Sequence, residues 1–213
     1  MASAPSPPRP SSAGPLPEVP HYDAVVLAGA HSRRLSGRDK AEIVVGGRRL
    51  IDRALDAVSG AGRIVVVGPP RAVGRTVEWT SERPSGGGPA AALWAGVRCV
   101  SSEIVVVLAV DLPFLDAPLV SRLAGEIARS DGSAYGSDGV ILCDASGRGQ
   151  PLAGAYLSRR LSDLMPDGPL TGASLKASLG PLRLAHIAET HATHDCDTWA
   201  DVEAAEAELR SRR

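Results

Sequence analysis

The sequence predicts an α/β fold, a three-layer α/β/α sandwich around a mostly parallel, Rossmann-like sheet. Short runs of Val, Ile and Leu alternate along the chain with segments whose apolar residues recur at helical spacing, which is typical of a parallel sheet covered on both faces. Aromatic residues make up only 3% of the chain, while Ala, Val, Leu and Gly are plentiful. This composition favours an aliphatic, layered core.

Apolar runs of four to nine residues, rich in β-branched side chains and mostly bounded by turn residues, are predicted as strands. The run EIVVVLAVD has the clearest pattern of a buried strand. The runs GVILCD and QPLAGAYL have no long helix between them, so we expect them to pair across a loop. In chain order the predicted strands are 24–28, 63–68, 76–79, 103–111, 139–144, 150–157 and 183–188.

Apolar residues three and four positions apart predict the helices between these strands. Glycines after Val58 and Leu179 are typical helix ends. In the last helix we expect Trp199, Val202 and Leu209 to face inward and the Glu and Arg residues to face solvent. The predicted helices lie near 51–58, 90–100, 119–127, 171–180 and 199–209.

The first twenty residues, MASAPSPPRPSSAGPLPEVP, are rich in Pro, Ser and Ala and hold no apolar run typical of a signal peptide. We expect residues 1–20 to form a disordered tail and residues 21–213 to form a single domain. No stretch approaches the roughly 18 apolar residues that a membrane span needs. We therefore predict a protein that is neither secreted nor integral to a membrane.

Charge and cysteine content narrow the possible partners. The net charge is −1 and the pI is near 6.5, so neither a nucleic acid nor a membrane surface is predicted as a partner, and any anion binding must be local. The three cysteines are widely spaced and show no metal-binding pattern. We interpret them as reduced thiols of a cytoplasmic protein.

A basic loop with small residues follows the first predicted strand, in the stretch VVLAGAHSRRLSGRDKAEIVV. The carboxyl ends of parallel strands are where α/β sheets collect ligands. Ala28, Gly29 and Ala30 would let the main chain approach a ligand, and Arg34 and Lys40 would supply charge for a polyphosphate. This loop predicts nucleoside triphosphate binding without a Walker or GxGxxG motif. The alternative is a solvated basic surface loop.

A carboxylate closes the apolar strand in VVVLAVDLPFLD, where Asp111 precedes a turn at Pro113. That position is at the same sheet edge as the basic loop, and a triphosphate there needs a divalent cation to neutralise its charge. Asp111 is therefore a candidate Mg²⁺ ligand. The alternative is a turn or helix-cap role, for which Asp116 is better placed.

Six stretches agree, in order, with the motifs of one known family, and together they span about residues 23–209. The first, LAGAHSRRLSGRDK, matches the pattern Leu-Ala-Gly-Gly-x-Ser-x-Arg-Met-Gly-x-x-Lys with some variation. The others are GGRRLIDRAL, GGGPAAALWAG, VDLPFL, QPLAGAY and DCDTWADVEAAE. The sequence thus resembles the molybdenum cofactor guanylyltransferases of the nucleotidylyltransferase superfamily, which implies one nucleotidyltransferase domain over residues 21–213.

The resemblance implies that the terminal phosphate of molybdopterin attacks the α-phosphate of GTP and releases pyrophosphate. Leu27, Ala28 and Gly29 would contact guanine and ribose through the main chain. Arg34 and Lys40 would hold the β- and γ-phosphates. A labile product also makes hand-off to other cofactor-assembly proteins an expectation.

The resemblance also implies residues for the metal and the acceptor. Asp111 would hold Mg²⁺, and Asp197 or Asp195 would approach from the other side, although Asp197 or Thr198 could instead cap the last helix. Two residues of the predicted strand at 150–157 and the loop at 171–176 would line the acceptor pocket, unless that loop is only structural. The two acceptor residues are Gln150 and Pro151.

Three positions depart from the family pattern. The mildest departure is Ser36, which replaces a glycine. Ala30 replaces the second glycine of the first motif, and Arg83 stands where an Asp often lies, so Glu82 would have to recognise guanine. Gly29 resembles the guanylyl branch, since related cytidylyltransferases tend to carry Ala there. The alternatives are a cytidylyl- or other nucleotidylyltransferase, or a catalytically impaired nucleotide-binding regulator. The joint presence of Arg34, Lys40 and Asp111 favours catalysis.

Overall fold

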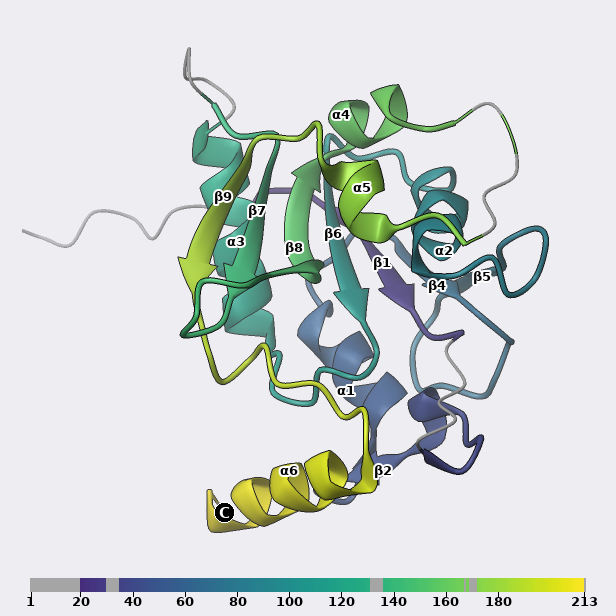
Figure 1. Ribbon diagram of the computed structural model, residues 1–213, viewed down its shortest axis with the longest axis vertical. Helices are drawn as coiled ribbons and strands as arrows, with labels where there is room; N and C mark the ends of the chain where they lie inside the picture. The colour runs from purple at the N-terminus through teal and green to yellow at the C-terminus, as the bar shows by residue number, and fades with distance from the viewer. Residues whose placement is uncertain (1–19, 30–34, 131–135, 167, 169–171, 213) are drawn as a thin grey trace, which may run out of the picture.

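A seven-stranded sheet forms the centre of the molecule, with helices on both faces (Figure 1). The structure, a computed structural model, describes residues 20–29, 35–130, 136–166, 168 and 172–212. The predicted α/β/α sandwich is confirmed. The sheet order is β5 (Glu78–Thr80), β4 (Ile64–Val67), β1 (Asp23–Leu27), β6 (Ile104–Ala109), β8 (Gly149–Leu157), β7 (Gly139–Cys143) and β9 (Leu184–Ala188).

The sheet is parallel except at β8. The ladders of β1 with β4 and β6, of β4 with β5 and of β7 with β9 are parallel. Strand β8 runs antiparallel to both β6 and β7, so the expected pairing of the segments near 139 and 150 is confirmed. The carboxyl ends of β1, β4 and β6 therefore lie at one edge of the sheet, at the lower side of Figure 1.

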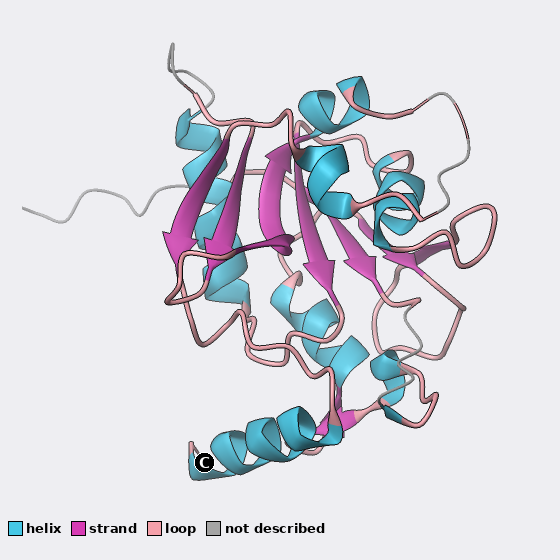
Figure 2. Cartoon of the chain, viewed as in Figure 1, coloured by secondary structure: helices cyan, strands magenta, loops and turns pink. Residues whose placement is uncertain are grey.

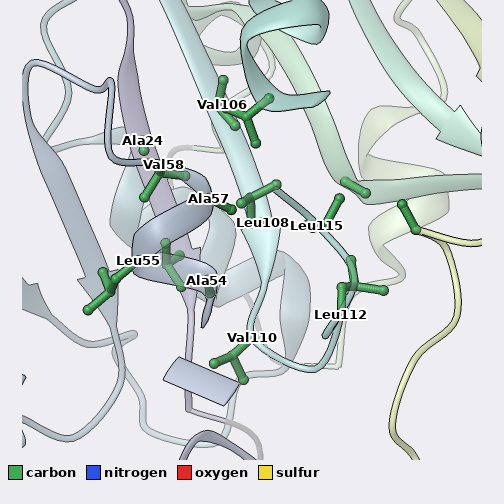
Figure 3. Close-up of a cluster of buried hydrophobic side chains, with 14 of the residues drawn as sticks. Ala24, Ala54, Leu55, Ala57, Val58, Val106, Leu108, Val110, Leu112 and Leu115 are labelled. Carbon is green, nitrogen blue, oxygen red and sulfur yellow. The ribbon is translucent and has the colours of Figure 1, made fainter. Parts of the chain in front are cut away.

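Two apolar layers hold the helices on the sheet, because alternate side chains of each buried strand point to opposite faces. Ala24 and Val26 of β1 join the layer under α1 (Leu50–Ala57) and α3 (Ala117–Ser130), part of which Figure 3 shows. Val25 and Leu27 join the layer under the helices of the other face. Those helices are α2 (Pro89–Val97), α4 (Ser158–Asp163) and α5 (Leu175–Leu179).

Side chains of the α1 layer are almost completely withdrawn from water. Leu108 of β6 and Leu55 of α1 are 0% and 2% exposed. Truncating a leucine at such a position costs roughly 2–5 kcal/mol, because the cavity that remains closes only in part. Packing of this kind fixes where β1 and β6 end, and hence where the following loops begin.

Short elements beyond the carboxyl edge were not predicted from the sequence. They are a 3-10 helix, η2 (Lys40–Glu42), and a hairpin of β2 (Val44–Val45) with β3 (Arg48–Arg49). Helix α6 (Trp199–Ser211) lies apart from the sheet and contacts β2 (Figure 2). Segments of two or three residues are too short to show a hydrophobic period, which explains why sequence patterns do not reveal them.

The expected inward position of Trp199 is wrong. Its side chain is 39% exposed, and the Arg38 guanidinium lies over its ring, 5.6 Å from the centroid. The physical reason is that α6 packs on a small hairpin rather than on the sheet, so it buries only a narrow stripe. Val202 and Ala205 form that stripe, and Leu209 packs partly against the core.

The structure bears on two further expectations about the chain. Cys99, Cys143 and Cys196 are all free thiols, and the last two are buried. In the described part of the chain, no helix has the length and apolar character to span a bilayer. The predicted tail at residues 1–20 falls outside the described residues except for Pro20.

Candidate active site

Lys40 lies between two aspartates at the carboxyl edge of the sheet. Its Nζ donates a hydrogen bond to Asp111 Oδ2 at 2.7 Å and another to Asp197 Oδ1. Lys40 is only 7% exposed although it begins a surface loop element, whereas the Asp197 side chain is 41% exposed. Three segments that are distant in the sequence thus place one cation and two anions together.

Electrostatic interactions keep Lys40 charged. Burial alone would lower the pKa of its ammonium, but the attraction and hydrogen bonds of Asp111 and Asp197 outweigh burial and raise the pKa. Asp195 lies within the same field. Burial, and then repulsion from Asp197 and Asp111, raise the pKa of the Asp195 carboxyl. The site therefore carries concentrated negative charge with one lysine held inside it.

Main-chain hydrogen bonds fix Asp111 between two neighbouring segments. The Val110 N–H donates to the Leu27 carbonyl at 3.1 Å, which joins the ends of β6 and β1. The Cys196 N–H donates to the Asp111 carbonyl at 2.9 Å, which ties in the segment before α6. Asp111 therefore has a defined position without using its side chain.

Helix capping is carried by neighbouring residues rather than by the site aspartates. Thr198 caps α6 in a reciprocal capping box with Asp201, while Asp197 contacts Lys40. Asp116 accepts from the Leu119 N–H at 2.9 Å and so caps α3. The capping alternatives considered for Asp111 and Asp197 are thus filled by Asp116 and Thr198.

A cavity of about 540 Å³ opens between the loops after β1, β4 and β5, a size typical of small-ligand sites. Among the expected nucleotide contacts, Gly29 and Glu82 line it. Glu82 Oε1 also accepts from the Gly86 N–H at 3.1 Å. The described lining residues are Gly29, Gly68, Pro69, Pro70, Trp79, Thr80, Ser81, Glu82, Arg83, Ser85 and Gly86.

Leu27 and Ala28 lie behind this cavity wall. Ala28 is 1% exposed, and its N–H donates to the Val67 carbonyl at 2.8 Å. Gly68 permits this close approach, since a Cβ there would lie 2.8 Å from the Ala28 main chain. Of the three expected main-chain contacts, Gly29 is therefore the one at the cavity surface.

Several residues predicted for the site have no contact, within the described residues, with the lysine cluster formed by Lys40, Asp111 and Asp197. Arg34, Ala30 and Thr171 lie outside the described residues. Gln150 and Pro151 lie at the start of β8, where the Pro151 carbonyl accepts from the Tyr156 hydroxyl at 2.6 Å. The acceptor pocket that was expected at these two residues stays a prediction.

Sequence reasoning missed Arg71. Its side chain is only 9% exposed, and its Nη1 lies 2.6 Å from Asp39 Oδ2. Asp39 caps η2 by accepting from the Ala41 N–H at 3.0 Å, so it orients the element that begins with Lys40. The available signal was an arginine just after the second strand, at the ligand-binding edge.

The oxygen donors of the lysine cluster suit Mg²⁺. Mg²⁺ is usually held by one or two carboxylates together with substrate phosphates and water. Asp111 and Asp197 both contact the Lys40 ammonium, which lies between them, so the two carboxylates lie close to each other. Within the described ranges, no group of three or more His, Cys, Asp or Glu forms a complete metal site. The donor chemistry of these two carboxylates is of the type that Mg²⁺ prefers.

Comparison with known proteins gives consistent results. The model of the MobA-like NTP transferase domain matches residues 24–180. A molybdenum cofactor guanylyltransferase of Acidiphilium cryptum is 33% identical over 201 residues, which cover 90% of this chain and 97% of that protein. A protein of the same name from Rhizobium johnstonii is 32% identical over 148 residues, covering 68% of this chain and 67% of that one.

The fold also matches solved structures. Molybdopterin-guanine dinucleotide biosynthesis protein A from Archaeoglobus fulgidus superposes with a TM-score of 0.70 at 23% identity, covering 90% of this chain and all of that one. A nucleotidyl transferase from Methanothermobacter thermautotrophicus gives a TM-score of 0.69 at 20% identity, with 91% and 99% covered. At such identities, the likeness establishes the fold.

Proposed function

The chain belongs to the family of MobA-like NTP transferase domains and is a nucleotidyltransferase, and from this premise we propose that it transfers GMP from GTP to molybdopterin. An oxygen of the terminal phosphate of molybdopterin forms a bond to the α-phosphorus of GTP. The bond from that phosphorus to the bridging oxygen of the β-phosphate breaks, and pyrophosphate leaves. This chemistry requires positioning and charge neutralisation rather than a protein nucleophile.

One observation carries the proposal: the Lys40, Asp111 and Asp197 cluster lies at the same sheet edge as the cavity lined by Gly29. A cation for phosphates, carboxylates for a metal and a cavity for a base are the parts that a nucleotidyl transfer needs.

Lys40 stabilises the triphosphate and the departing pyrophosphate. Its ammonium is already desolvated and held by carboxylates, so it needs little reorganisation when the phosphates arrive. Arg34 supplies a second positive charge to the β- and γ-phosphates in this proposal. Both groups counter charge that accumulates on the leaving group.

Asp111 would hold Mg²⁺ together with Asp197, and Asp195 adds negative charge nearby. When bound, Mg²⁺ neutralises charge on the phosphates and polarises the α-phosphate. The Asp111 carbonyl accepts from the Cys196 N–H, and the preceding residue, Val110, is bonded to the end of β1, so this carboxylate starts from a fixed main chain. The Asp197 side chain is more exposed than that of Asp111, at 41% against 17%, so it lies nearer to the entering substrate in this proposal.

The guanine base occupies the 540 Å³ cavity. The Glu82 carboxylate accepts from the N1–H and the 2-amino group of guanine, a pair of donors that cytosine does not present. Gly29 lets the ribose approach the main chain closely. Gln150 and Pro151, with residues 171–176, line the molybdopterin side.

The protein acts in the cytoplasm in this proposal, which agrees with its free thiols. Its substrates are GTP and molybdopterin, and other cofactor-assembly proteins would receive the labile product. Neither a nucleic acid nor a membrane is a proposed partner.

The test is pyrophosphate release from GTP, CTP, ATP and UTP by the full chain with Mg²⁺, with and without molybdopterin. We expect turnover with GTP that depends on molybdopterin. Equal turnover with CTP would reassign the activity to the cytidylyl branch. Tight binding of a triphosphate without turnover of any would instead support the alternative, a catalytically impaired nucleotide-binding regulator.

A further inference from the structure

Arg71 contacts three segments around the candidate active site, and this inference rests on the function proposed above. Its Nη1 binds Asp39 Oδ2 at 2.6 Å, and its Nη2 donates to the Ala28 carbonyl at 3.3 Å. Its Nε donates to the Pro69 carbonyl at 3.2 Å. The guanidinium therefore joins the end of β1, the cap of η2 and the wall of the base cavity.

Burial makes these contacts stronger than those of an ordinary surface arginine. The Arg71 side chain is 9% exposed, so its charge is largely removed from water and depends on its protein partners. The Glu42 carboxylate lies 3.5 Å from Nη1 and adds a further anion. The Cζ atom also lies 6.0 Å from the centroid of the Trp79 ring, another wall of the cavity.

Each partner of Arg71 connects to a group that the reaction uses. Asp39 caps η2, whose first residue is Lys40. Ala28 directly precedes Gly29, which lines the cavity. Pro69 and Trp79 line the same cavity. One planar guanidinium therefore holds the phosphate side and the base side of the site in a fixed relation.

We propose that Arg71 is a positioning residue that couples the base cavity to Lys40, so that a bound base places the triphosphate in register with the ammonium. Arg71 need not touch the nucleotide. A lysine cannot replace it, because a single ammonium lacks the planar fork that reaches Asp39, Ala28 and Pro69 together.

The experiment compares Arg71→Gln and Arg71→Lys with a matched control, Arg49→Gln. Arg49 also donates to Glu42 and to a nearby carbonyl, that of Ala72, but its other hydrogen bonds within the described residues go to Asp52. The Arg49 variant therefore shows what the loss of a structural arginine does in the same region.

Calorimetry measures GTP binding in the absence of acceptor. Pyrophosphate release gives kcat and KM, and the thermal midpoint of unfolding reports whether each variant folds.

We expect both Arg71 variants to weaken GTP binding by about tenfold or more and to raise KM, while Arg49→Gln stays within about twofold at a comparable change in thermal midpoint. If Arg71→Gln folds poorly, Asp39→Asn tests the same contact from its other side, because asparagine can still cap η2. It should weaken GTP binding similarly, and the Asp39→Asn, Arg71→Gln double variant should be little worse than either alone.

Two results would overturn the proposal. If Arg71→Gln and Arg49→Gln bind GTP equally well, Arg71 only supports the fold. If the Asp39 and Arg71 effects on binding simply add, the two residues act independently. Failure of the proposed function can be distinguished from both results, because the unmodified chain itself would then neither bind nor turn over GTP. In that case the inference about Arg71 would fail with the proposed function.

Discussion

The ammonium of Lys40 and the carboxylate of Asp111 lie 2.7 Å apart, although 71 positions separate them in the sequence. The parallel pairing of β1 with β6 creates this proximity, because it brings the loops after both strands to one edge. The Lys40 side chain is 8% exposed and that of Asp111 17%. The pair is therefore largely shielded from water and is unlike a surface salt bridge.

Asp111→Asn tests the metal role of this carboxylate. We expect kcat to fall by about 100-fold or more, because the amide lacks the charge that holds Mg²⁺ near the phosphates. The free energy of unfolding should fall by about 1–2 kcal/mol, since buried Lys40 loses one of its two anions. Pyrophosphate release and urea unfolding measure the two effects.

The matched control is Asp116→Asn, in the same loop but bonded to the α3 N-terminus. Asparagine caps helices nearly as well as aspartate, so this variant should keep both activity and stability. An Asp111→Asn enzyme with more than about a tenth of normal activity would contradict the assigned role.

Asp197 and Asp195 are distinguished by their response to Mg²⁺. Asp197 lies beside Asp111 at Lys40 and is the second proposed Mg²⁺ ligand, so Asp197→Asn should raise the Mg²⁺ concentration for half-maximal activity by about tenfold. Asp195→Asn should change it by about twofold at most. Titration of activity with Mg²⁺ at saturating GTP gives both values, and a reversed order would make Asp195 the ligand.

Glu82 is the candidate for base discrimination. Glu82→Gln replaces one acceptor oxygen with a donor, so kcat/KM for GTP should fall by about tenfold while that for CTP changes little. Glu78→Gln is the control, because Glu78 on β5 is exposed and pairs with Arg63 outside the cavity. An equal loss with both nucleotides would show that Glu82 only supports the turn through its bond to Gly86.

The sheet could be predicted because its strands are long apolar runs separated by clear turn residues. β6 illustrates this, since the run around Val106 has no polar interruption and must be buried on both faces. The position of Asp111 at the ligand edge followed from that strand alone. Trp199 could not be placed in the same way, because its environment depends on the hairpin at 44–49, which has no sequence period.

The contacts within the site show the same limit. Lys40 and Asp111 could be named as candidates from the sequence, because Lys40 ends the first family motif and Asp111 follows a recognisable strand. Arg71 was missed because its role depends on a three-way geometry among Asp39, Ala28 and Pro69, and a lone arginine in a loop carries no such information. The N-cap of α6 could be predicted in part, because the sequence suggested Asp197 or Thr198 and the structure shows that Thr198 caps the helix.

Asp138 provides a stability prediction away from the candidate site. Its side chain is 3% exposed and accepts hydrogen bonds from the Arg183 N–H at 2.9 Å and from Arg160 Nε at 2.9 Å. Burial alone would raise the pKa of this carboxyl, but the bonds from Arg183 and Arg160 outweigh burial and lower the pKa from 3.8 to about 2. The carboxylate thereby ties the start of β7 to α4 and β9.

Because the folded pKa lies below the unfolded value, the ionised group stabilises the protein above about pH 4, and this contribution disappears as the pH falls toward 2. Asp138→Asn should therefore lower the free energy of unfolding by about 2 kcal/mol at pH 7 and by progressively less below pH 4. Urea unfolding across this pH range measures the difference. Asp163→Asn is the control, because Asp163 is 64% exposed and should give a small, nearly constant change. A loss for Asp138→Asn that stayed equally large at pH 2.5 would mean that packing, and not the charge, stabilises this corner of the sheet.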